Sequence, residues 1–233
     1  MDTLPNVNTP RGGTEPSHAG LTSNVSPKVQ GPEAENSHTG VSSDFVPKNK
    51  QRWFVLRATY GRSKKANEAL EKGKVKTYVP MHFVYKEVNG KKMRVQEPLV
   101  PNIIFAYMTR EQTYDYVKEP ALTASYLKYY TDKTRPVESS TGHNPPVIIP
   151  DAVMEQFIKA SSIESDHSMM LPKERCRFKK DELVRVVKGD FRGVVGKVTR
   201  AAGQQRVGIE IDSIGIFVTA YIPSDFMEKL DRL

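Results

Sequence analysis

The sequence is poor in cysteine and contains no long apolar run. Cys176 is the only cysteine among 233 residues, so no disulfide can form within the chain and a cysteine-based metal site is not expected. No apolar stretch approaches the roughly 18 residues that a membrane-spanning helix needs, and a basic start followed by an apolar core, as in a secretion signal, is missing. We therefore expect a cytoplasmic protein without membrane contact.

The first fifty residues are almost free of aromatic side chains. Phe45 is the only aromatic residue there, whereas six of the sixteen prolines fall in this segment. Such a composition buries too little apolar surface to offset the entropy of ordering, so residues 1–50 are predicted to be a disordered tail. Within it, 17–28 and 37–48 form an imperfect repeat, which is either a duplicated spacer or a doubled binding motif.

The charge is unevenly distributed along the chain. The net charge is +8, and residues 1–50 contain four basic and five acidic side chains, which leaves +9 for residues 51–233. A basic folded part indicates polyanionic partners such as DNA or RNA, although many basic proteins merely have basic surfaces.

Residues 51–162 read as an α+β sandwich with a mostly antiparallel sheet. An apolar run from Trp53 to Leu56 predicts a buried strand, and Asn89–Gly90 predicts a hairpin turn. Thr109 and Gln112 form the pattern of a capping box. The other expected elements are a helix from an N-cap at Ser63 to Gly73, strands at 103–108 and 125–130, and a helix capped by Asp151.

Residues 163–176 read as a linker, and only strands follow it. The expected strands are 182–188, 194–200, 206–211 and 214–222, with a short one near Phe226. Five short strands in residues 177–233 predict a small β-barrel.

Three glycines interrupt the valine-rich segment "VKGDFRGVVGKV" at 187–198. A phosphate-binding loop does not fit, because Phe191 stands where its first glycine would be and Val198 where its hydroxyl ligand would be. A strand–turn–strand corner fits: Gly189 and Gly193 permit positive φ, and Gly196 permits close approach of a bent strand.

The same residues carry a resemblance to a known family. The segment with Gly189, Phe191, Gly193 and Gly196 resembles a KOW motif, which ribosomal proteins and transcription factors share. In order, "RWFVLRATYG", the basic helix, "YVP", the hairpin, "LVPNIIFAYM" and "VIIPDAVMEQFI" resemble the N-terminal domain of NusG-type elongation factors. The resemblance covers residues 51–233 and implies that the barrel is an SH3-like KOW domain.

One departure from the family pattern points to a specialised member. NusG proteins usually read Pro-Gly-Tyr where this chain has Pro101-Asn102-Ile103. Pro-Asn is more typical of paralogues such as RfaH, and the layout resembles UpxY-like antiterminators of capsular polysaccharide operons.

The resemblance implies an apolar pocket that binds the clamp helices of RNA polymerase and so disfavours pausing. Carried onto this chain, the pocket comprises Trp53, Tyr85, Val100, Ile103 and Phe105. The alternative is that these side chains are ordinary core, which we favour for Phe105.

A second implied surface is basic and lies around the start of the first helix. In RfaH-like proteins this region reaches the non-template DNA strand, and nascent RNA is the other candidate. Its residues here are Arg57, Tyr60, Arg62, Lys64 and Lys65, and the alternative is a solvated helix face.

The barrel of relatives contacts ribosomal protein S10 or the terminator Rho. Phe191, at the turn, is either a contact residue or a buried aromatic that closes the barrel end. Because β-branched residues and glycines crowd the barrel strands, we expect no refolding into helices of the RfaH kind. We expect a monomer.

Catalysis is not expected, nor is a cofactor or a bound metal. The five histidines have no mutual metal-ligand spacing, and no nucleophile–base motif is present. Two hypotheses remain: a polymerase-bound elongation or antitermination factor, or a KOW-type RNA-binding or ribosome-associated adaptor. Within the first, a cofactor of Rho-dependent termination is a further possibility.

Overall fold

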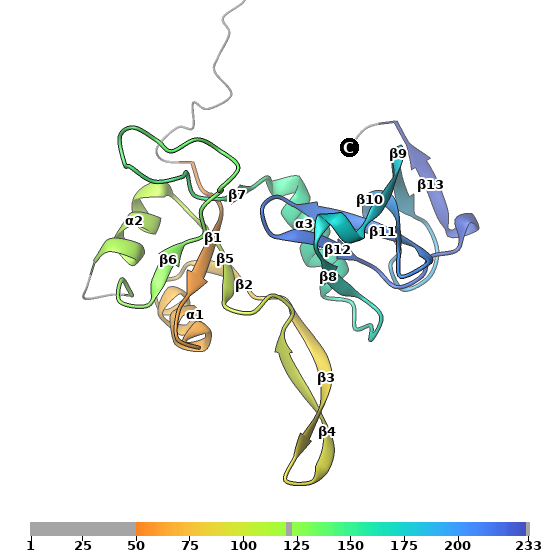
Figure 1. Ribbon diagram of the computed structural model, residues 1–233, viewed down its shortest axis with the longest axis horizontal. Helices are drawn as coiled ribbons and strands as arrows, with labels where there is room; N and C mark the ends of the chain where they lie inside the picture. The colour runs from red at the N-terminus through yellow and green to blue at the C-terminus, as the bar shows by residue number, and fades with distance from the viewer. Residues whose placement is uncertain (1–49, 120–122, 232–233) are drawn as a thin grey trace, which may run out of the picture. The chain divides into compact units, whose positions relative to one another are not determined.

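The computed structural model describes residues 50–119 and 123–231 (Figure 1). Except for Lys50, the predicted tail with its repeat lies outside the described residues.

An antiparallel sheet organises the N-terminal part of the described chain. Its strands follow the order β2-β5-β1-β6, and β7 also pairs with β1. The strands are β1 (Arg52–Ala58), β2 (Lys76–Tyr78), β5 (Ile103–Met108), β6 (Leu127–Tyr129) and β7 (Ile148–Ile149). The central pair, β1 and β5, is buried almost throughout, as the continuous apolar run at Trp53 predicts.

Helices cover both faces of this sheet, so the predicted sandwich is confirmed. Phe54 and Leu56 share a cluster with the buried residues of α1 (Ser63–Lys72) and α2 (Arg110–Lys118). Because side chains alternate along a strand, Trp53 and Val55 face the opposite side, in a cluster with α3 (Asp151–Ser161).

The sequence predicted the cap of α2 correctly, but not the caps of α1 and α3. The capping box of α2 is confirmed: the Thr109 hydroxyl accepts from the Gln112 backbone amide at 3.2 Å, and the Thr109 amide donates to the Gln112 side chain at 2.9 Å. Ser63 and Asp151 were wrong as caps, because each is the first helical residue and makes no capping bond. Gly73 ends α1 as expected, but its φ is −77°, and the residue with the left-handed backbone is Lys74 at φ 58°.

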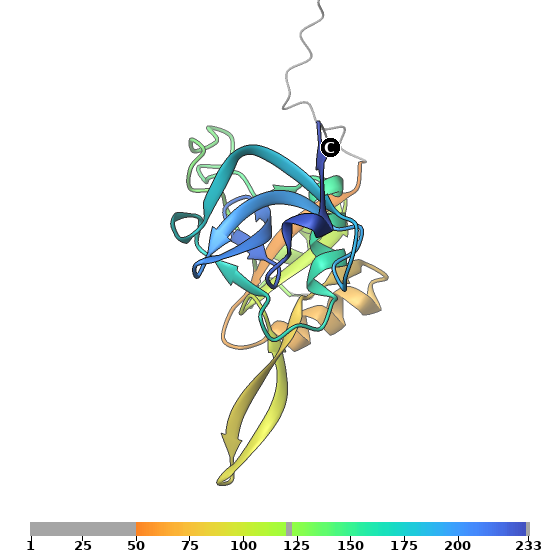
Figure 2. The same cartoon turned by 90° about the vertical axis from the view of Figure 1, so that its right-hand side faces the viewer.

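A long hairpin forms a two-stranded sheet of its own. It comprises β3 (Met81–Val88) and β4 (Lys91–Pro98), joined by Asn89 at φ 53° and Gly90 at φ 72°. These angles confirm the predicted turn. The hairpin projects away from the helices and sheets on either side of it in the chain (Figures 1 and 2).

The C-terminal part is a six-stranded antiparallel sheet, here named the C-terminal sheet. Its order is β13-β9-β10-β11-β12-β8, so β13 and β8 are its two ends, and no pairing joins them within the described residues. The strands are β8 (Met169–Leu171), β9 (Arg177–Val186), β10 (Val195–Ala201), β11 (Gln204–Ile211), β12 (Gly215–Val218) and β13 (Met227–Leu230), with short 3₁₀ turns at η1 (Lys173–Arg175) and η2 (Ser224–Phe226).

The predicted five-stranded barrel therefore requires correction. The sheet has a sixth strand, β8, which comes from the segment 163–176 expected to be a linker. β8 pairs with the edge of β12, and its Met169 and Leu171 pack against Ile216 and Val218. This addition covers an edge that the other five strands leave open.

The glycine-rich corner between β9 and β10 has the predicted geometry. Gly189 and Gly193 have φ of 77° and 82°. A Cβ at Gly196 would lie 2.7 Å from the carbonyl oxygen of Gly208, so the close approach predicted there is confirmed. Phe191 is only 4% exposed, so the structure has it as a buried aromatic.

Candidate functional surfaces

Four of the five residues implied for the polymerase pocket come together on one face of the N-terminal sheet. Trp53, Ile103 and Phe105 belong to one buried cluster, and Val100 is half-buried against it. Trp53 lies with its ring centroid 5.3 Å from that of Tyr107, and Phe105 lies 5.4 Å from Phe157 of α3. Their exposed fractions are 5% for Trp53, 4% for Ile103 and 0% for Phe105.

α3 and the C-terminal sheet contribute to the same cluster. The rings of Phe157 and Phe217 meet edge to face at 5.7 Å. The Val195 amide donates to the side-chain oxygen of Gln156 at 2.8 Å, and the Lys159 ammonium donates to the Gly193 carbonyl at 2.8 Å. Trp53 and Ile103 are therefore buried in a cluster that also contains residues of α3 and the C-terminal sheet.

Tyr85 does not join the other four residues. It lies on β3 of the hairpin, 60% exposed, and its ring is 5.0 Å from the Lys92 ammonium. The sequence places it near Val100 along the chain, but it lies on a hairpin that forms a sheet of its own (Figure 1).

The predicted basic surface is assembled around the start of α1. Arg57, Tyr60, Arg62, Lys64 and Lys65 are all exposed, and Tyr60 is 84% exposed. The Arg62 guanidinium lies 5.7 Å from the rings of both Tyr60 and Tyr126. Tyr60 has φ 57°, a conformation that costs an ordinary residue energy and often marks a functional position.

Two neighbours of this surface were missed from the sequence. Tyr126 lies under Arg62 and also 5.5 Å from the Lys65 ammonium. Lys128, exposed on β6, stands directly opposite Arg57 of β1. Like charges opposite each other on a sheet repel, so the pairing concentrates positive charge where an anion would be stabilised. The segment 125–130 was predicted as a strand, but only the tertiary pairing sets it beside β1.

One partly buried tyrosine of β6 has altered acidity. Burial raises the pKa of Tyr129, which follows Lys128, to about 12.

Within the described ranges, no three His, Cys, Asp or Glu side chains come together to hold a metal ion. None of the described helices has the length and apolar character to cross a membrane.

The fold and these surfaces define the class of the N-terminal part: an α+β sandwich with a projecting hairpin and an exposed basic, aromatic surface. Comparison with known families agrees with this class. Residues 51–158 match the family NusG, described as transcription termination factor nusG. This match supports a role in transcription elongation or termination and is consistent with RNA polymerase as the main partner.

Proposed function

We propose that this protein is a specialised transcription elongation factor that binds the clamp helices of RNA polymerase and suppresses pausing or termination. The observation that carries the proposal is the NusG match over 51–158. It is supported by the placement of Trp53, Val100, Ile103 and Phe105 in one cluster on one sheet face.

The mechanism is a shift of populations. A module that holds the two sides of the polymerase cleft favours the closed clamp over the paused conformation, and a few kcal/mol of differential binding is enough for this effect. The basic surface around Tyr60 and Arg62 supplies phosphate attraction and a stacking ring for the exposed non-template strand or for nascent RNA.

Antitermination on long capsular polysaccharide operons is the particular role we propose. Its support is the Pro101-Asn102-Ile103 segment, which departs from the usual Pro-Gly-Tyr of NusG proteins. Asn102 has φ 63°, so it keeps the left-handed backbone that glycine would adopt while adding a side chain, whose oxygen lies 3.4 Å from the Ser63 hydroxyl.

We propose that the C-terminal sheet is a KOW domain that contacts ribosomal protein S10 or Rho. Its corner at Gly189, Gly193 and Gly196 supports this assignment. The same corner favours the second candidate, an RNA-binding or ribosome-associated adaptor that acts away from polymerase.

Binding of the full chain to purified cognate RNA polymerase tests the first proposal. Val100→Glu places a charge at the rim of the cluster and is expected to weaken binding at least tenfold, whereas Val137→Glu, at a valine that is 56% exposed, is the matched control. Equal binding by both variants, or no binding by the folded wild type, would leave the adaptor as the better account.

Transcription on a long template then separates the possible outcomes. We expect more full-length transcript when the protein is added, both with Rho and without it. More termination in the presence of Rho would identify a Rho cofactor instead.

A further inference from the structure

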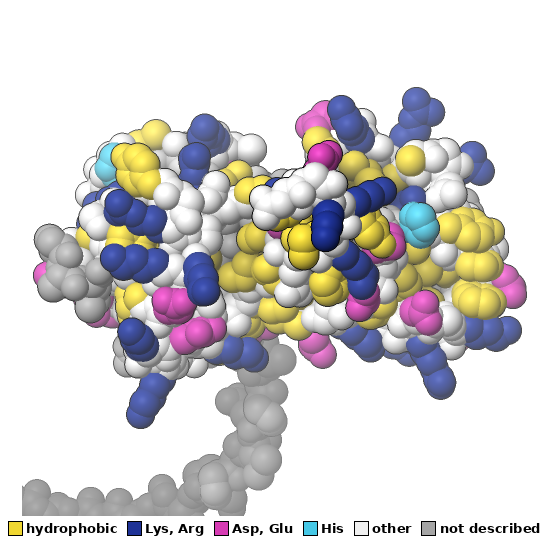
Figure 3. Space-filling view, turned by 90° about the horizontal axis from the view of Figure 1, so that it is seen from below, with side chains coloured by type: hydrophobic (Ala, Val, Ile, Leu, Met, Phe, Trp, Pro, Cys, Tyr) yellow, Lys and Arg dark blue, Asp and Glu magenta, His cyan; other side chains and the backbone are white. Residues whose placement is uncertain are grey.

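The β3–β4 hairpin carries aromatic and basic side chains that lie outside the cluster of Trp53, Val100, Ile103 and Phe105. Its strands form a separate sheet with eight cross-strand pairs, and each strand extends for roughly 25 Å at about 3.3 Å per residue. Seen from the side on which the hairpin ends, hydrophobic and Lys or Arg side chains lie next to each other (Figure 3).

The register places four of these side chains on one face, here named the hairpin face: Phe83, Tyr85, Lys92 and Arg94. Tyr85 stands opposite Arg94, and Phe83 and Lys92 lie two residues earlier on their own strands, to either side of this pair on the same face. The Arg94 guanidinium lies 3.9 Å from the centroid of Phe83, and the Lys92 ammonium lies 5.0 Å from that of Tyr85. Each of the two cations therefore lies against an aromatic ring of the other strand, while Glu87 stands opposite Lys92 on the same face.

These rings are exposed to a degree that a structural role does not require. Tyr85 is 60% exposed and Phe83 is 36% exposed, although the hairpin already has an apolar cross-strand pair on its other face, Val84 with Val95. Exposed aromatic rings rimmed by cations suit a ligand with flat apolar groups and a negatively charged backbone.

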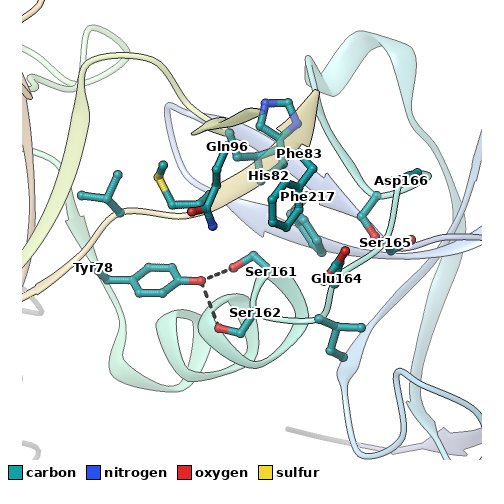
Figure 4. Close-up of a pocket in the computed structure, with 15 residues that line it drawn as sticks. Tyr78, His82, Phe83, Gln96, Ser161, Ser162, Glu164, Ser165, Asp166 and Phe217 are labelled. Carbon is teal, nitrogen blue, oxygen red and sulfur yellow. Dashed lines mark hydrogen bonds between the residues drawn. The ribbon is translucent and has the colours of Figure 1, made fainter. Parts of the chain in front are cut away.

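Two acidic side chains contact Arg94 of the hairpin face. Glu164, which follows α3, forms an ion pair with Arg94, and Asp166 lies 3.7 Å from the same guanidinium. Phe83, Glu164 and Asp166 line one cavity of about 340 Å³ (Figure 4). These carboxylates raise the pKa of Arg94 and stand where phosphate oxygens would stand in a complex.

We propose that the hairpin face binds single-stranded nucleic acid. Tyr85 and Phe83 stack on bases, Lys92 and Arg94 bind phosphates, and Glu164 and Asp166 compete with those phosphates for Arg94. A duplex is disfavoured because its bases are already stacked on each other. The site is separate from the surface around Tyr60 and needs no polymerase.

Fluorescence anisotropy with the full chain tests the proposal. The probes are fluorescein-labelled dT12 and U12, which distinguish DNA from RNA, and a 12-base-pair duplex. Tyr85→Ala and Phe83→Ala are expected to weaken single-strand binding at least fivefold, while Tyr85→Phe keeps the ring and the affinity. Tyr114→Ala is the matched control, because Tyr114 is 58% exposed on α2.

Further variants test the cationic and acidic groups. Arg94→Ala is expected to reduce the salt dependence of binding by about one phosphate contact. Glu164→Gln with Asp166→Asn is expected to tighten binding severalfold, because Arg94 is released. Lys64→Ala with Lys65→Ala reports separately on the surface at α1.

Three outcomes would overturn the proposal. The first is that neither the wild type nor the Glu164→Gln/Asp166→Asn variant binds the single-stranded probes. The second is that Tyr85→Ala binds them with wild-type affinity. The third is that the wild type binds the duplex as tightly as the single strands. Retained polymerase binding in such a case would leave the proposed function standing without this site.

Discussion

Asn102 shows how one residue can depart from a family pattern and still preserve its backbone. Its φ of 63° lies in the left-handed region, and its carbonyl accepts a hydrogen bond from the Ala58 amide at 2.9 Å. Glycine adopts this conformation without steric cost, and asparagine tolerates it better than other residues. The turn before β5 is therefore kept, and the difference lies in the side chain.

Substitution of Asn102 tests this interpretation. Asn102→Gly is expected to change the free energy of unfolding by less than about 1 kcal/mol, whereas Asn102→Val is expected to lower it by about 1–2 kcal/mol, because a β-branched residue resists positive φ. Urea denaturation at an unchanged m-value measures both. Equal stability of the valine and glycine variants would show that the left-handed backbone is not held in solution.

At the scale of elements, the close pairing of β10 with β11 depends on the absence of a side chain at Gly196. A Cβ at Gly196 would lie 2.7 Å from the Gly208 carbonyl oxygen and 2.7 Å from a methyl group of Val207. No side chain fits there unless the strands separate. Glycine at position 196 therefore lets β10 and β11 lie this close together.

Gly196→Ala is expected to lower the free energy of unfolding by about 1–3 kcal/mol, as overpacking of a tight core does. The control is Gly203→Asn in the β10–β11 turn, where nothing lies within 4 Å and asparagine suits the φ of 76°. Thermal or urea unfolding compares the two variants. A smaller loss in Gly196→Ala than in the control would contradict the packing argument.

At the scale of the whole described chain, one buried cluster joins the N-terminal sheet, α3 and the C-terminal sheet. Hydrogen bonds at its edge join α3 to the C-terminal sheet: the Gln156 side chain accepts from the Val195 amide, and the Lys159 ammonium donates to the Gly193 carbonyl. Trp53 and Ile103, which belong to the proposed polymerase surface, lie in this cluster. Under that proposal, these contacts would compete with polymerase for the same face.

Gln156→Ala leaves the Val195 amide without its partner, and an unmet buried donor costs about 1–3 kcal/mol. We expect hydrogen exchange at Val195 to accelerate about tenfold or more, and polymerase binding to strengthen when Lys159→Ala is added. Glu155→Ala, at an exposed position of α3, is the control. Unchanged exchange at Val195 would show that the contact does not hold the two parts together.

Several local features were predictable from the sequence because they depend on neighbouring residues alone. The capping box at Thr109 and Gln112, the turn at Asn89–Gly90 and the positive φ of Gly189 and Gly193 all follow from short-range sterics and hydrogen bonding. The caps expected at Ser63 and Asp151 were wrong by one residue, because helix ends fray and local pattern alone does not fix their first residue.

The candidate surfaces were predictable in composition but not in their assembly. The five basic-surface residues around α1 are exposed, as expected for a surface, yet Tyr126 and Lys128 join them only because β6 pairs with β1. The family resemblance groups Tyr85 with Trp53, and the direction of the hairpin separates the two.

By itself, the sequence determined most of the strands, the helices, the basic charge and the NusG-like order of segments, because each can be recognised from local pattern and composition. Only the tertiary structure decided that β8 completes the C-terminal sheet, that Trp53 and Ile103 are covered, and that Arg94 is held by Glu164 and Asp166. The physical reason is that these contacts join residues far apart in the chain, and their free energy depends on packing that no local pattern encodes.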